Sequence, residues 1–420
     1  GALAGMSEVA RTAFRRAGIM VIESSDELFP AAETLSSLPP VRNNQVAILA
    51  DGGGHATIAA DLLSEEGVEI PVLGEKTQAK LRKILPPAAA VRNPVDVAGG
   101  ADANPALFAD CAQTLLQDPN IGGLLLVGLF GGYSIRFAKS LAYEEEDAAH
   151  RLGKLVGETN KPIVVHSLYS YARPHSLDLL RYYNITVYDS LEIASRCIGL
   201  LAEYGRYLHS YAASTNFVLQ WGAKARRRGT SLIRQARADG RAALLEHEAR
   251  ELLGLHGAPC GAYQLARTAK EAVAAASAID GPVAMKIVSP RILHKSDAGG
   301  VRLGVRGVKA VRQAFREIKE NTRAFDPEAE FRGVLVAPMA PAGTEVIVGT
   351  KIDDQFGPVI MFGIGGIMVE ALKDVAFRVL PVSNRTAKLM IDDIQAAALL
   401  NGYRGRQPVD KKALRKLLLT

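Results

Sequence analysis

The residues from Val46 to about Ser190 alternate short apolar runs with amphipathic helical stretches, and this alternation restricts the possible folds more than any other feature. The first two runs end in glycine turns that open helices. Strand, glycine turn and helix in succession predict βαβ units and a doubly wound parallel sheet. Ligands of such sheets bind beyond the carboxyl ends of the strands, where both glycine turns lie. The stretches with these apolar runs are Val46–Ala50, Gly123–Leu141, Lys161–Tyr169 and Ile185–Ser190.

The composition is that of a globular protein with more than one domain. The chain has 420 residues, with 48% hydrophobic and 22% charged residues, so it can bury large cores. The formal net charge is +6, and only residues 224–229 and 410–420 are locally basic. Aromatic residues do not interleave with these clusters, so we expect no nucleic-acid partner. A mild positive excess suits small anions such as nucleotides and CoA.

The cysteines and the hydropathy of the chain indicate in which cellular compartment the protein is expected. Cys111, Cys197 and Cys260 lie far apart and form no CxxC pair, which argues for a reducing compartment and against a structural zinc. We find no signal-like start and no apolar run of transmembrane length, so we expect a cytoplasmic protein without a membrane partner. The chain lacks an initiator methionine and looks like part of a longer one.

The second half follows a different pattern. Residues 210–230 are polar and basic, and we interpret 211–230 as a linker. Beyond it an amphipathic helix (Glu246–Pro259), a helix that starts with the capping pair Thr268 and Glu271, and several strands predict an α+β domain. The expected antiparallel strands lie in Gly333–Met339, Thr344–Gly366 and Val375–Val382, with a hairpin turn at Asp353–Gly357.

Lys286 stands inside the apolar strand "VAMKIV", where its charge costs several kcal/mol unless an anion meets it. The strand holds no acidic residue, so a ligand phosphate is a natural partner. The alternative is a lysine that snorkels from an edge strand. Gly299 and Gly300 follow at a spacing that suits a loop over phosphates, with its N–H groups free to donate. The strand "VLVAPM" then offers an edge that can hydrogen-bond a base.

The order of these pieces resembles an ATP-grasp domain: a lysine strand, a glycine loop, a hinge strand, a glutamate and a second glycine-rich hairpin. The stretches "MKIVSPRILHKSDAGGVRLGV", "GTEVIVGTKIDDQFGPVIMFGIGGIMVE" and "LKDVAFRVLPV" resemble the ATP-grasp module of NDP-forming (ADP-forming) acyl-CoA synthetases, relatives of succinyl-CoA synthetase. The resemblance implies that Lys286 and Lys295 hold ATP phosphates under a loop, that a hinge strand takes adenine, that Glu345 orients the nucleotide or its metal, and that Arg378 clamps phosphate. The loop residues are Ser296, Gly299 and Gly300; the hinge residues are Val336, Ala337 and Met339; and Glu370, Lys373 and Asp374 line the same cleft.

His294, in the motif "HKSD", is the candidate catalytic residue of this module. By the resemblance it takes phosphate transiently between the nucleotide and a second, mobile histidine. Neutral imidazole is a competent nucleophile at pH 7, and Lys295 could offset the phosphoryl charge. The alternative is that His294 only hydrogen-bonds the loop. The family carries Mg²⁺ on an acidic-Asn-Pro strand and a later Asp that this chain does not contain, so the metal ligands are unknown.

Residues 93–132 and Ala50–Leu63 resemble the flavodoxin-like domain of the succinyl-CoA synthetase β chain, in a match from about Val41 to Ser210. In that family, a helix after the "FGG" turn points its N-terminus at a phosphohistidine, which its unpaired N–H groups can receive. Gly131 and Gly132 would start this catalytic helix, and Gly53 and Gly54 a second one. The alternative is a pair of plain βα turns without a ligand.

The first residues, "GALAGMSEVARTAFRRAGI", resemble the segment that follows the family's catalytic-histidine loop. We therefore expect four parts: a tail of a phosphohistidine domain (1–40), a flavodoxin-like domain (41–210), the linker (211–230) and an incomplete ATP-grasp domain (231–420). The CoA-binding and phosphohistidine domains would lie upstream in the same longer chain and act as partners.

The resemblance implies an acid–thiol ligase that makes acyl-CoA from a carboxylic acid, CoA and ATP, and releases ADP and phosphate through an acyl phosphate and a phosphohistidine. We also expect a homo-oligomer. The alternative function is a CoA- or nucleotide-sensing portion of a protein acetyltransferase that has lost ligase activity. An unrelated ATP-grasp carboxylase is excluded, because nothing in the first half resembles a biotin or bicarbonate partner. The sequence does not identify the acid or decide between ATP and GTP.

Overall fold

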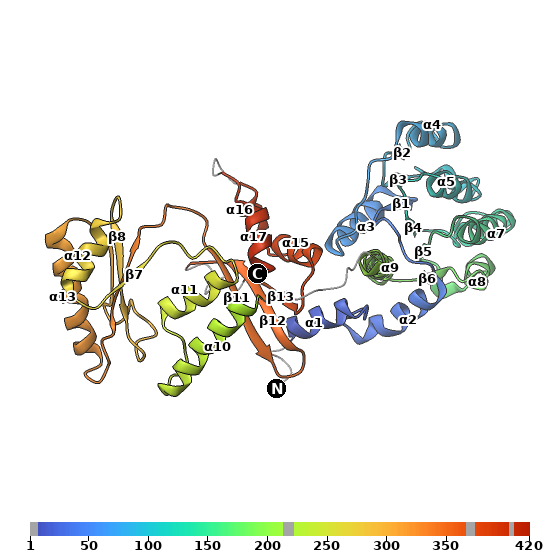
Figure 1. Ribbon diagram of the computed structural model, residues 1–420. Coiled ribbons are helices and arrows are strands. Elements are labelled where there is room, and N and C mark those ends of the chain that lie inside the picture. Colours follow the sequence, from blue (N-terminus) through green and yellow to red (C-terminus); the bar gives the residue numbers. More distant parts are fainter. Residues whose placement is uncertain (1–6, 213–221, 367–373, 403–406) are drawn as a thin grey trace. The chain divides into compact units, whose positions relative to one another are not determined.

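The computed structural model describes residues 7–212, 222–366, 374–402 and 407–420. It divides into two compact units, Gly1–Thr215 and Asn216–Thr420 (Figure 1). The division falls within residues 211–230, where a linker is predicted. Residues 223–230 of that stretch begin helix α10 (Ala223–Ala238). The finer division into four parts stays a prediction.

The first unit is built on a six-stranded sheet in the order β2-β3-β1-β4-β5-β6. All neighbours are parallel except β2 and β3, which pair antiparallel at the edge. The predicted doubly wound parallel sheet is therefore confirmed, including all four strands expected from the apolar runs. The strands are β1 (Val46–Ala50), β2 (Ala90–Val91), β3 (Val95–Asp96), β4 (Gly123–Gly128), β5 (Ile163–Ser167) and β6 (Thr186–Tyr188).

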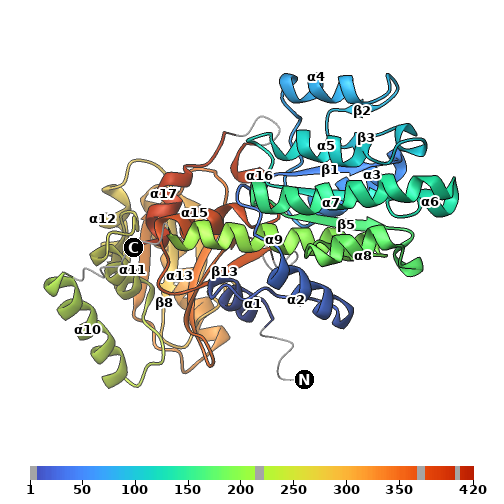
Figure 2. The same cartoon turned by 90° about the vertical axis from the view of Figure 1, so that its right-hand side faces the viewer.

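Helices cover both faces of this sheet, because alternate residues of each buried strand feed two separate cores. Ile48 packs with residues of α2, α3 and α9, whereas Leu49 packs with residues of α4, α5, α7 and α8. Figure 2 shows these helices around the sheet. The helices are α1 (Ser7–Arg16), α2 (Leu28–Ser37), α3 (Gly53–Glu65), α4 (Glu75–Ile84), α5 (Leu107–Leu116), α6 (Tyr133–Arg136), α7 (Ala142–Thr159), α8 (His175–Tyr182) and α9 (Leu191–Ala212), with short 3-10 turns at Ser25–Glu27, Gly100–Asp102, Lys139–Leu141 and Ser170–Ala172.

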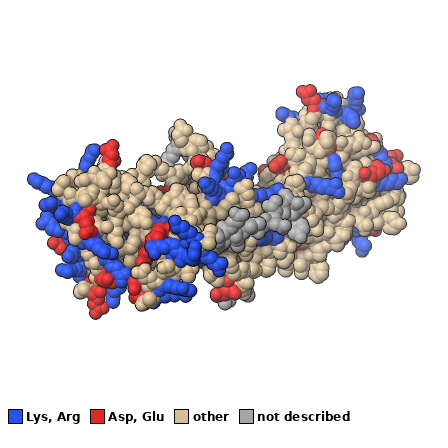
Figure 3. Space-filling model, viewed as in Figure 1, with Lys and Arg blue, Asp and Glu red and all other residues tan. Residues whose placement is uncertain are grey.

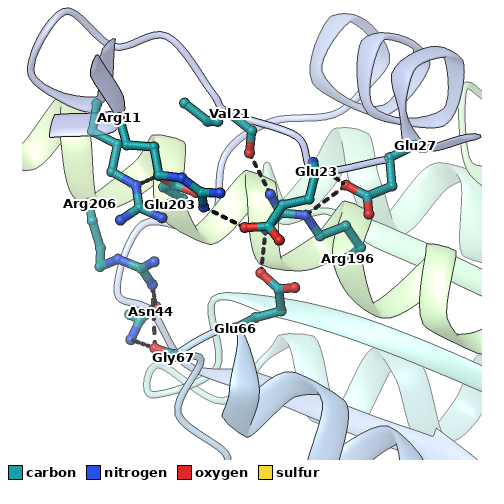
Figure 4. A network of polar contacts seen from close by, with 11 residues as sticks. Arg11, Val21, Glu23, Glu27, Asn44, Glu66, Gly67, Arg196, Glu203 and Arg206 are labelled. Carbon is teal, nitrogen blue, oxygen red and sulfur yellow. Dashed lines mark hydrogen bonds and ion pairs between the residues drawn. The ribbon is translucent and has the colours of Figure 1, made fainter. Parts of the chain in front are cut away.

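Arg196 of α9 ties the N-terminal helices to this unit (Figure 4). Its guanidinium donates to the carbonyl oxygen of Val21 at 2.6 Å and pairs with Glu27 at 3.3 Å and with Glu66, at the end of α3, at 2.5 Å. The guanidinium fork can serve three acceptors at once, which a lysine could not do with the same geometry. The segment that precedes β1 is thus held against α3 and α9.

The second unit starts with an antiparallel four-stranded sheet in the order β7-β10-β8-β9. Helices α12 and α13 bury their apolar sides against it, with Ile318 and Met285 fully buried in the shared core. The hydroxyl of Thr268 accepts from the N–H of Glu271, as the capping pattern predicts. The elements are α11 (Glu246–Leu255), β7 (Gln264–Ala266), α12 (Ala269–Ser277), β8 (Val283–Val288), β9 (Val301–Val305), α13 (Val308–Phe325) and β10 (Gly333–Pro338).

A second antiparallel sheet, β11-β12-β13, follows along the chain. The carboxylate of Asp353 accepts from the N–H groups of Gln355 and Phe356, which closes the predicted hairpin turn between β11 and β12. The predicted α+β architecture of the second half is thereby confirmed. The elements are β11 (Val346–Asp353), β12 (Gly357–Ile364), β13 (Val375–Val379), α15 (Asn384–Asp392), α16 (Ala397–Leu400) and α17 (Lys411–Leu418).

The surface carries charges of both signs, as the composition predicts. On the face shown in Figure 3, Lys and Arg side chains are interspersed with Asp and Glu. Within the described ranges, every helix is either too short or too polar to cross a lipid bilayer.

Candidate functional site

Lys286 lies on an interior strand of the second unit. It pairs with Leu335 on β10 and with Val301 on β9, and the residues beside it on β8 are buried. The alternative of an edge-strand lysine is therefore wrong. About a third of its side chain is exposed, so the ammonium group reaches solvent on one side of the sheet.

A carboxylate from another element meets this lysine. Oε1 of Glu246, the first residue of α11, lies 3.5 Å from Nζ of Lys286, and its Oε2 lies 3.1 Å from Nζ of Lys295. Arg250, one helical turn further on, pairs with the same carboxylate at 2.8 Å. Burial acts to raise the pKa of Glu246, but Lys286, Lys295 and Arg250 outweigh it and hold the pKa below its ordinary value of 4.5.

Sequence reasoning missed Glu246 because it searched for an acid only within the lysine's own strand. The available signal was an acidic residue in the first turn of a predicted helix, a position that favours negative charge whatever its partner. The structure thus brings Lys286 and Lys295 together, and it adds Glu246 between them.

The glycine loop after β8 has the expected tight turn, but two of its N–H groups are already used. Gly299 donates to the carbonyl oxygen of Ser296 at 3.0 Å, and Gly300 donates to that of Lys295 at 2.8 Å. Gly299 has a φ of +57°, and a Cβ on Gly300 would approach Ile287 to 2.4 Å. The expectation that both glycine N–H groups are free for phosphate is wrong, since these glycines shape the loop.

His294 and Ser296 are exposed at the lip of this loop, whereas Lys295 between them is half-buried and turned to Glu246. A ligand could therefore reach the imidazole from solvent with a lysine beside it. The relay role of His294 and the phosphate contacts of Ser296 stay predictions.

The hinge strand β10 is only partly an edge. Val336 is fully buried and pairs with Gln264 on β7 and Met285 on β8, so it lies inside the sheet. Ala337 continues along β8 alone, past the end of β7, and the sulfur of Met339 accepts from the N–H of Gly304 at 3.4 Å. The free edge predicted for a base therefore excludes Val336, and the N–H of Met339 is also used, since it donates to the carbonyl oxygen of Pro282 at 3.2 Å.

The remaining predicted residues of this module have different surroundings. Glu345 is exposed directly before β11. Arg378 of β13 pairs with Asp393 and donates to the carbonyl oxygen of Phe377 at 2.7 Å. The buried carboxylate of Asp374 accepts from two backbone N–H groups, those of residues 395 and 396, at 2.7 Å each, so it caps a turn. Glu370 and Lys373 lie outside the described residues.

In the first unit, both glycine turns follow neighbouring parallel strands. β1 and β4 are adjacent, and their helices leave to opposite faces, so the turns meet at the switch point where ligands of such sheets bind. Helix α3 begins at Gly53, and its N-cap residue Gly52 makes no side-chain cap, so among the described residues the first-turn N–H groups of Gly53 and Gly54 have no side-chain acceptor.

A buried glutamate from α7 caps the N-terminus of α6, the helix that follows the second glycine turn. Glu145 of α7 is fully buried and accepts from the N–H of Tyr133 at 2.9 Å and of Ser134 at 3.1 Å. Gly132 donates to the carbonyl oxygen of Leu129 at 2.7 Å, and Gly131 has a φ of +90°. Helix α6 starts where Gly131 and Gly132 predicted, but the expectation of unpaired N–H groups there is wrong for residues 132–134.

Asp51 links the two turns. Its Oδ2 accepts from the N–H of Leu129 at 2.6 Å and from the hydroxyl of Tyr133 at 2.9 Å. Burial raises the pKa of Asp51 despite these hydrogen bonds. An acid directly after a buried strand was the sequence signal, and it was overlooked in favour of the glycines.

No group of three or more His, Cys, Asp or Glu that could hold a metal ion occurs in the described part of the chain. Mg²⁺ that accompanies a nucleotide needs only one or two carboxylates besides phosphate and water, so the metal ligands stay unassigned.

Two family models match the chain: an ATP-grasp domain over residues 235–420 and a Ligase-CoA domain over residues 46–177. Over 418 residues the chain is 32% identical to a 4-hydroxybutyrate–CoA ligase [ADP-forming] of Nitrosopumilus maritimus, covering 98% of this chain and 56% of that protein. Over 421 residues it is 34% identical to the acetate–CoA ligase [ADP-forming] I of Archaeoglobus fulgidus, covering 100% and 58%. The chain thus spans little more than half the length of these relatives.

A shorter relative matches about half of this chain and more of its own length. The acetate–CoA ligase [ADP-forming] I subunit beta of Pyrococcus furiosus is 47% identical over 197 residues, covering 47% of this chain and 83% of that subunit. Among solved structures, acetyl-coenzyme A synthetase 1 of Ca. Korarchaeum cryptofilum, in complex with coenzyme A and Ca-AMPCP, is 46% identical, with a TM-score of 0.44 and coverage of 45% of this chain and 82% of that chain.

Proposed function

Because the chain belongs to the ADP-forming acyl-CoA synthetase family, we propose that the protein carrying it joins a carboxylic acid to CoA with ATP and releases ADP and phosphate. Two relatives that match over nearly the whole chain are named ADP-forming acid–CoA ligases. The observation that carries the proposal is the convergence of Lys286 and Lys295 on one carboxylate beside the His294 loop. Two ammonium groups held together there suit the charge of a polyphosphate.

In the proposed mechanism, Lys286 and Lys295 bind the phosphates, and the edge from Ala337 to Met339 takes the adenine. Glu345, exposed before β11, orients the nucleotide. Arg378 assists only if it exchanges its ion pair with Asp393 for one with phosphate. Mg²⁺ would offset phosphate charge when it accompanies ATP, and one or two carboxylates would complete the ligands it takes from phosphate and water.

The first chemical step is an in-line transfer to His294. A ring nitrogen attacks the γ-phosphorus, a P–N bond forms, the bridging P–O bond breaks, and the electron pair leaves with ADP. Lys295, adjacent in the chain, offsets charge on the phosphoryl group. The phosphoryl group then passes to a second histidine in the upstream partner domain, and from there to the acid.

The first unit receives that phosphohistidine in the proposed cycle. Helix α3 is the better candidate receptor, because Gly53 and Gly54 start it without a side-chain cap. The α6 turn at Gly131 and Gly132 contributes less, since Glu145 already accepts from the first helical N–H groups. The acyl phosphate formed there would react with the CoA thiolate, which releases phosphate and yields acyl-CoA.

The test uses the full protein that carries this chain, with ATP, CoA and a panel of carboxylic acids, and separates ADP from AMP by chromatography. ADP release that requires both CoA and one acid supports the ligase and identifies its substrate. Nucleotide binding without acid-dependent ADP would favour the sensory role, and AMP would contradict the mechanism. A cytoplasmic location and a homo-oligomeric state stay predictions.

A further inference from the structure

The carboxylate of Glu246 lies where a ligand phosphate is expected. Its side chain is only 18% exposed, and it contacts two lysines and Arg250 at 2.8 to 3.5 Å. Each lysine, by contrast, keeps about a third of its side chain in solvent, 35% for Lys286 and 27% for Lys295. The cations are thus accessible from outside, while their present counter-ion comes from within the chain.

The charges in this group do not balance. Three cations face one carboxylate, so the group retains an excess of positive charge that a polyphosphate can neutralise. A carboxylate and a phosphate offer these ammonium groups similar oxygen acceptors. No further acid pairs with Lys286 or Lys295 in the described ranges, so both lysines depend on Glu246 when no ligand is bound.

We propose that Glu246 is an internal placeholder for the nucleotide phosphates: it pairs with Lys286 and Lys295 in the ligand-free chain, and nucleotide binding exchanges these ion pairs for pairs with phosphate. The inference rests on the proposed function in one respect, namely that the ligand is a nucleotide. Glu246 is then a positioning residue that prearranges two lysines and at the same time competes with the ligand for them.

This exchange has a thermodynamic signature. Glu246→Gln keeps the shape of the side chain but removes its charge, so it weakens the ligand-free state more than the bound state, in which only the pair with Arg250 remains. By linkage, the stability lost without ligand reappears as tighter binding. Because the lysines are partly exposed, solvent screens each pair, and we expect roughly a three- to tenfold lower Kd.

The experiment measures Kd by titration calorimetry for the 420-residue chain and its variants, with a non-hydrolysable ATP analogue and with inorganic tripolyphosphate. Thermal unfolding is followed with and without each ligand. The matched control is Glu251→Gln, because Glu251 lies on the same helix and pairs with Arg228 at 2.6 Å, away from both lysines.

The proposal expects E246Q to bind both ligands more tightly than wild type, to unfold at a lower temperature without ligand, and to lose less of its Tm at saturation, where only the pair with Arg250 is affected. E251Q should leave both Kd values unchanged. Equal or weaker binding by E246Q, with the same loss of Tm in both states, would show a purely structural glutamate and overturn the placeholder while leaving the proposed function intact. If neither wild type nor E246Q bound either ligand, the proposed function itself would fail, and the inference with it.

Discussion

At the scale of single residues, Lys286 owes its position to β8 and its ion pair to Glu246, a neighbour on another element. Replacing it leaves Glu246 paired with Lys295 and Arg250, so the fold should tolerate the loss.

We expect Lys286→Met to change the free energy of unfolding by less than about 1 kcal/mol, since the pair is partly exposed. The affinity for an ATP analogue should fall roughly tenfold or more, because a charge-assisted contact to phosphate is lost. Calorimetric titration and thermal unfolding measure the two effects. Lys351→Met, on β11, is the matched control and should leave affinity unchanged. Unaltered binding by K286M would place the phosphates elsewhere.

Asp51 gives a pH signature of the first unit. Burial raises its pKa in the folded chain above the ordinary value of 3.8, so its charged form costs stability at neutral pH. As the pH falls, the folded chain takes up this proton before the unfolded chain does, and the cost disappears. Asp51→Asn removes the charge, and its amide oxygen can still accept from Leu129 and Tyr133.

D51N should therefore be more stable than wild type near neutral pH. This gain in the free energy of unfolding should shrink as the pH falls toward the ordinary aspartate range. Urea unfolding at a series of pH values measures this difference. A difference that stays constant or grows with acidification would mean that Asp51 is not destabilised by burial.

At the scale of elements, the short helix α6 depends on a cap from α7. Glu145→Ala leaves two backbone donors of a buried turn without their acceptor, which should cost roughly 2 kcal/mol or more. Glu145→Gln keeps one carbonyl acceptor and should cost less. Denaturant unfolding gives the values, with Glu144→Gln as the control from the same helical turn. Equal stabilities for E145A and E144Q would show that α6 does not need this cap.

The elements were predictable from sequence where the information is local. The alternation of apolar runs with helical stretches, together with the glycine turn, predicted β1 and α3. The turn-forming residues around Asp353 predicted the hairpin. Each of these signals depends only on neighbouring residues. Strand order is not local, so Val336 was expected at an edge but lies between two strands. The partners Glu246 and Glu145 were missed for the same reason, because each reaches its site from a different helix.

At the scale of the whole molecule, the two units bury separate cores. The apolar clusters of the first unit draw on residues 38–202, and those of the second on residues 245–418. Scanning calorimetry of the chain should accordingly resolve at least two transitions. An ATP analogue should raise only the transition that belongs to the second unit, and E145A should lower only that of the first. A single transition shifted by both changes would contradict this independence.

In the proposed mechanism, this chain carries phosphate transiently on His294. The most direct measurement mixes the full protein with ATP labelled at the γ-phosphate, quenches within one turnover, and maps acid-labile label to peptides. We expect label on the peptide that contains His294, formed together with ADP, and its loss from that peptide in His294→Asn. Label confined to another histidine, with ADP formed as fast in H294N as in wild type, would contradict it.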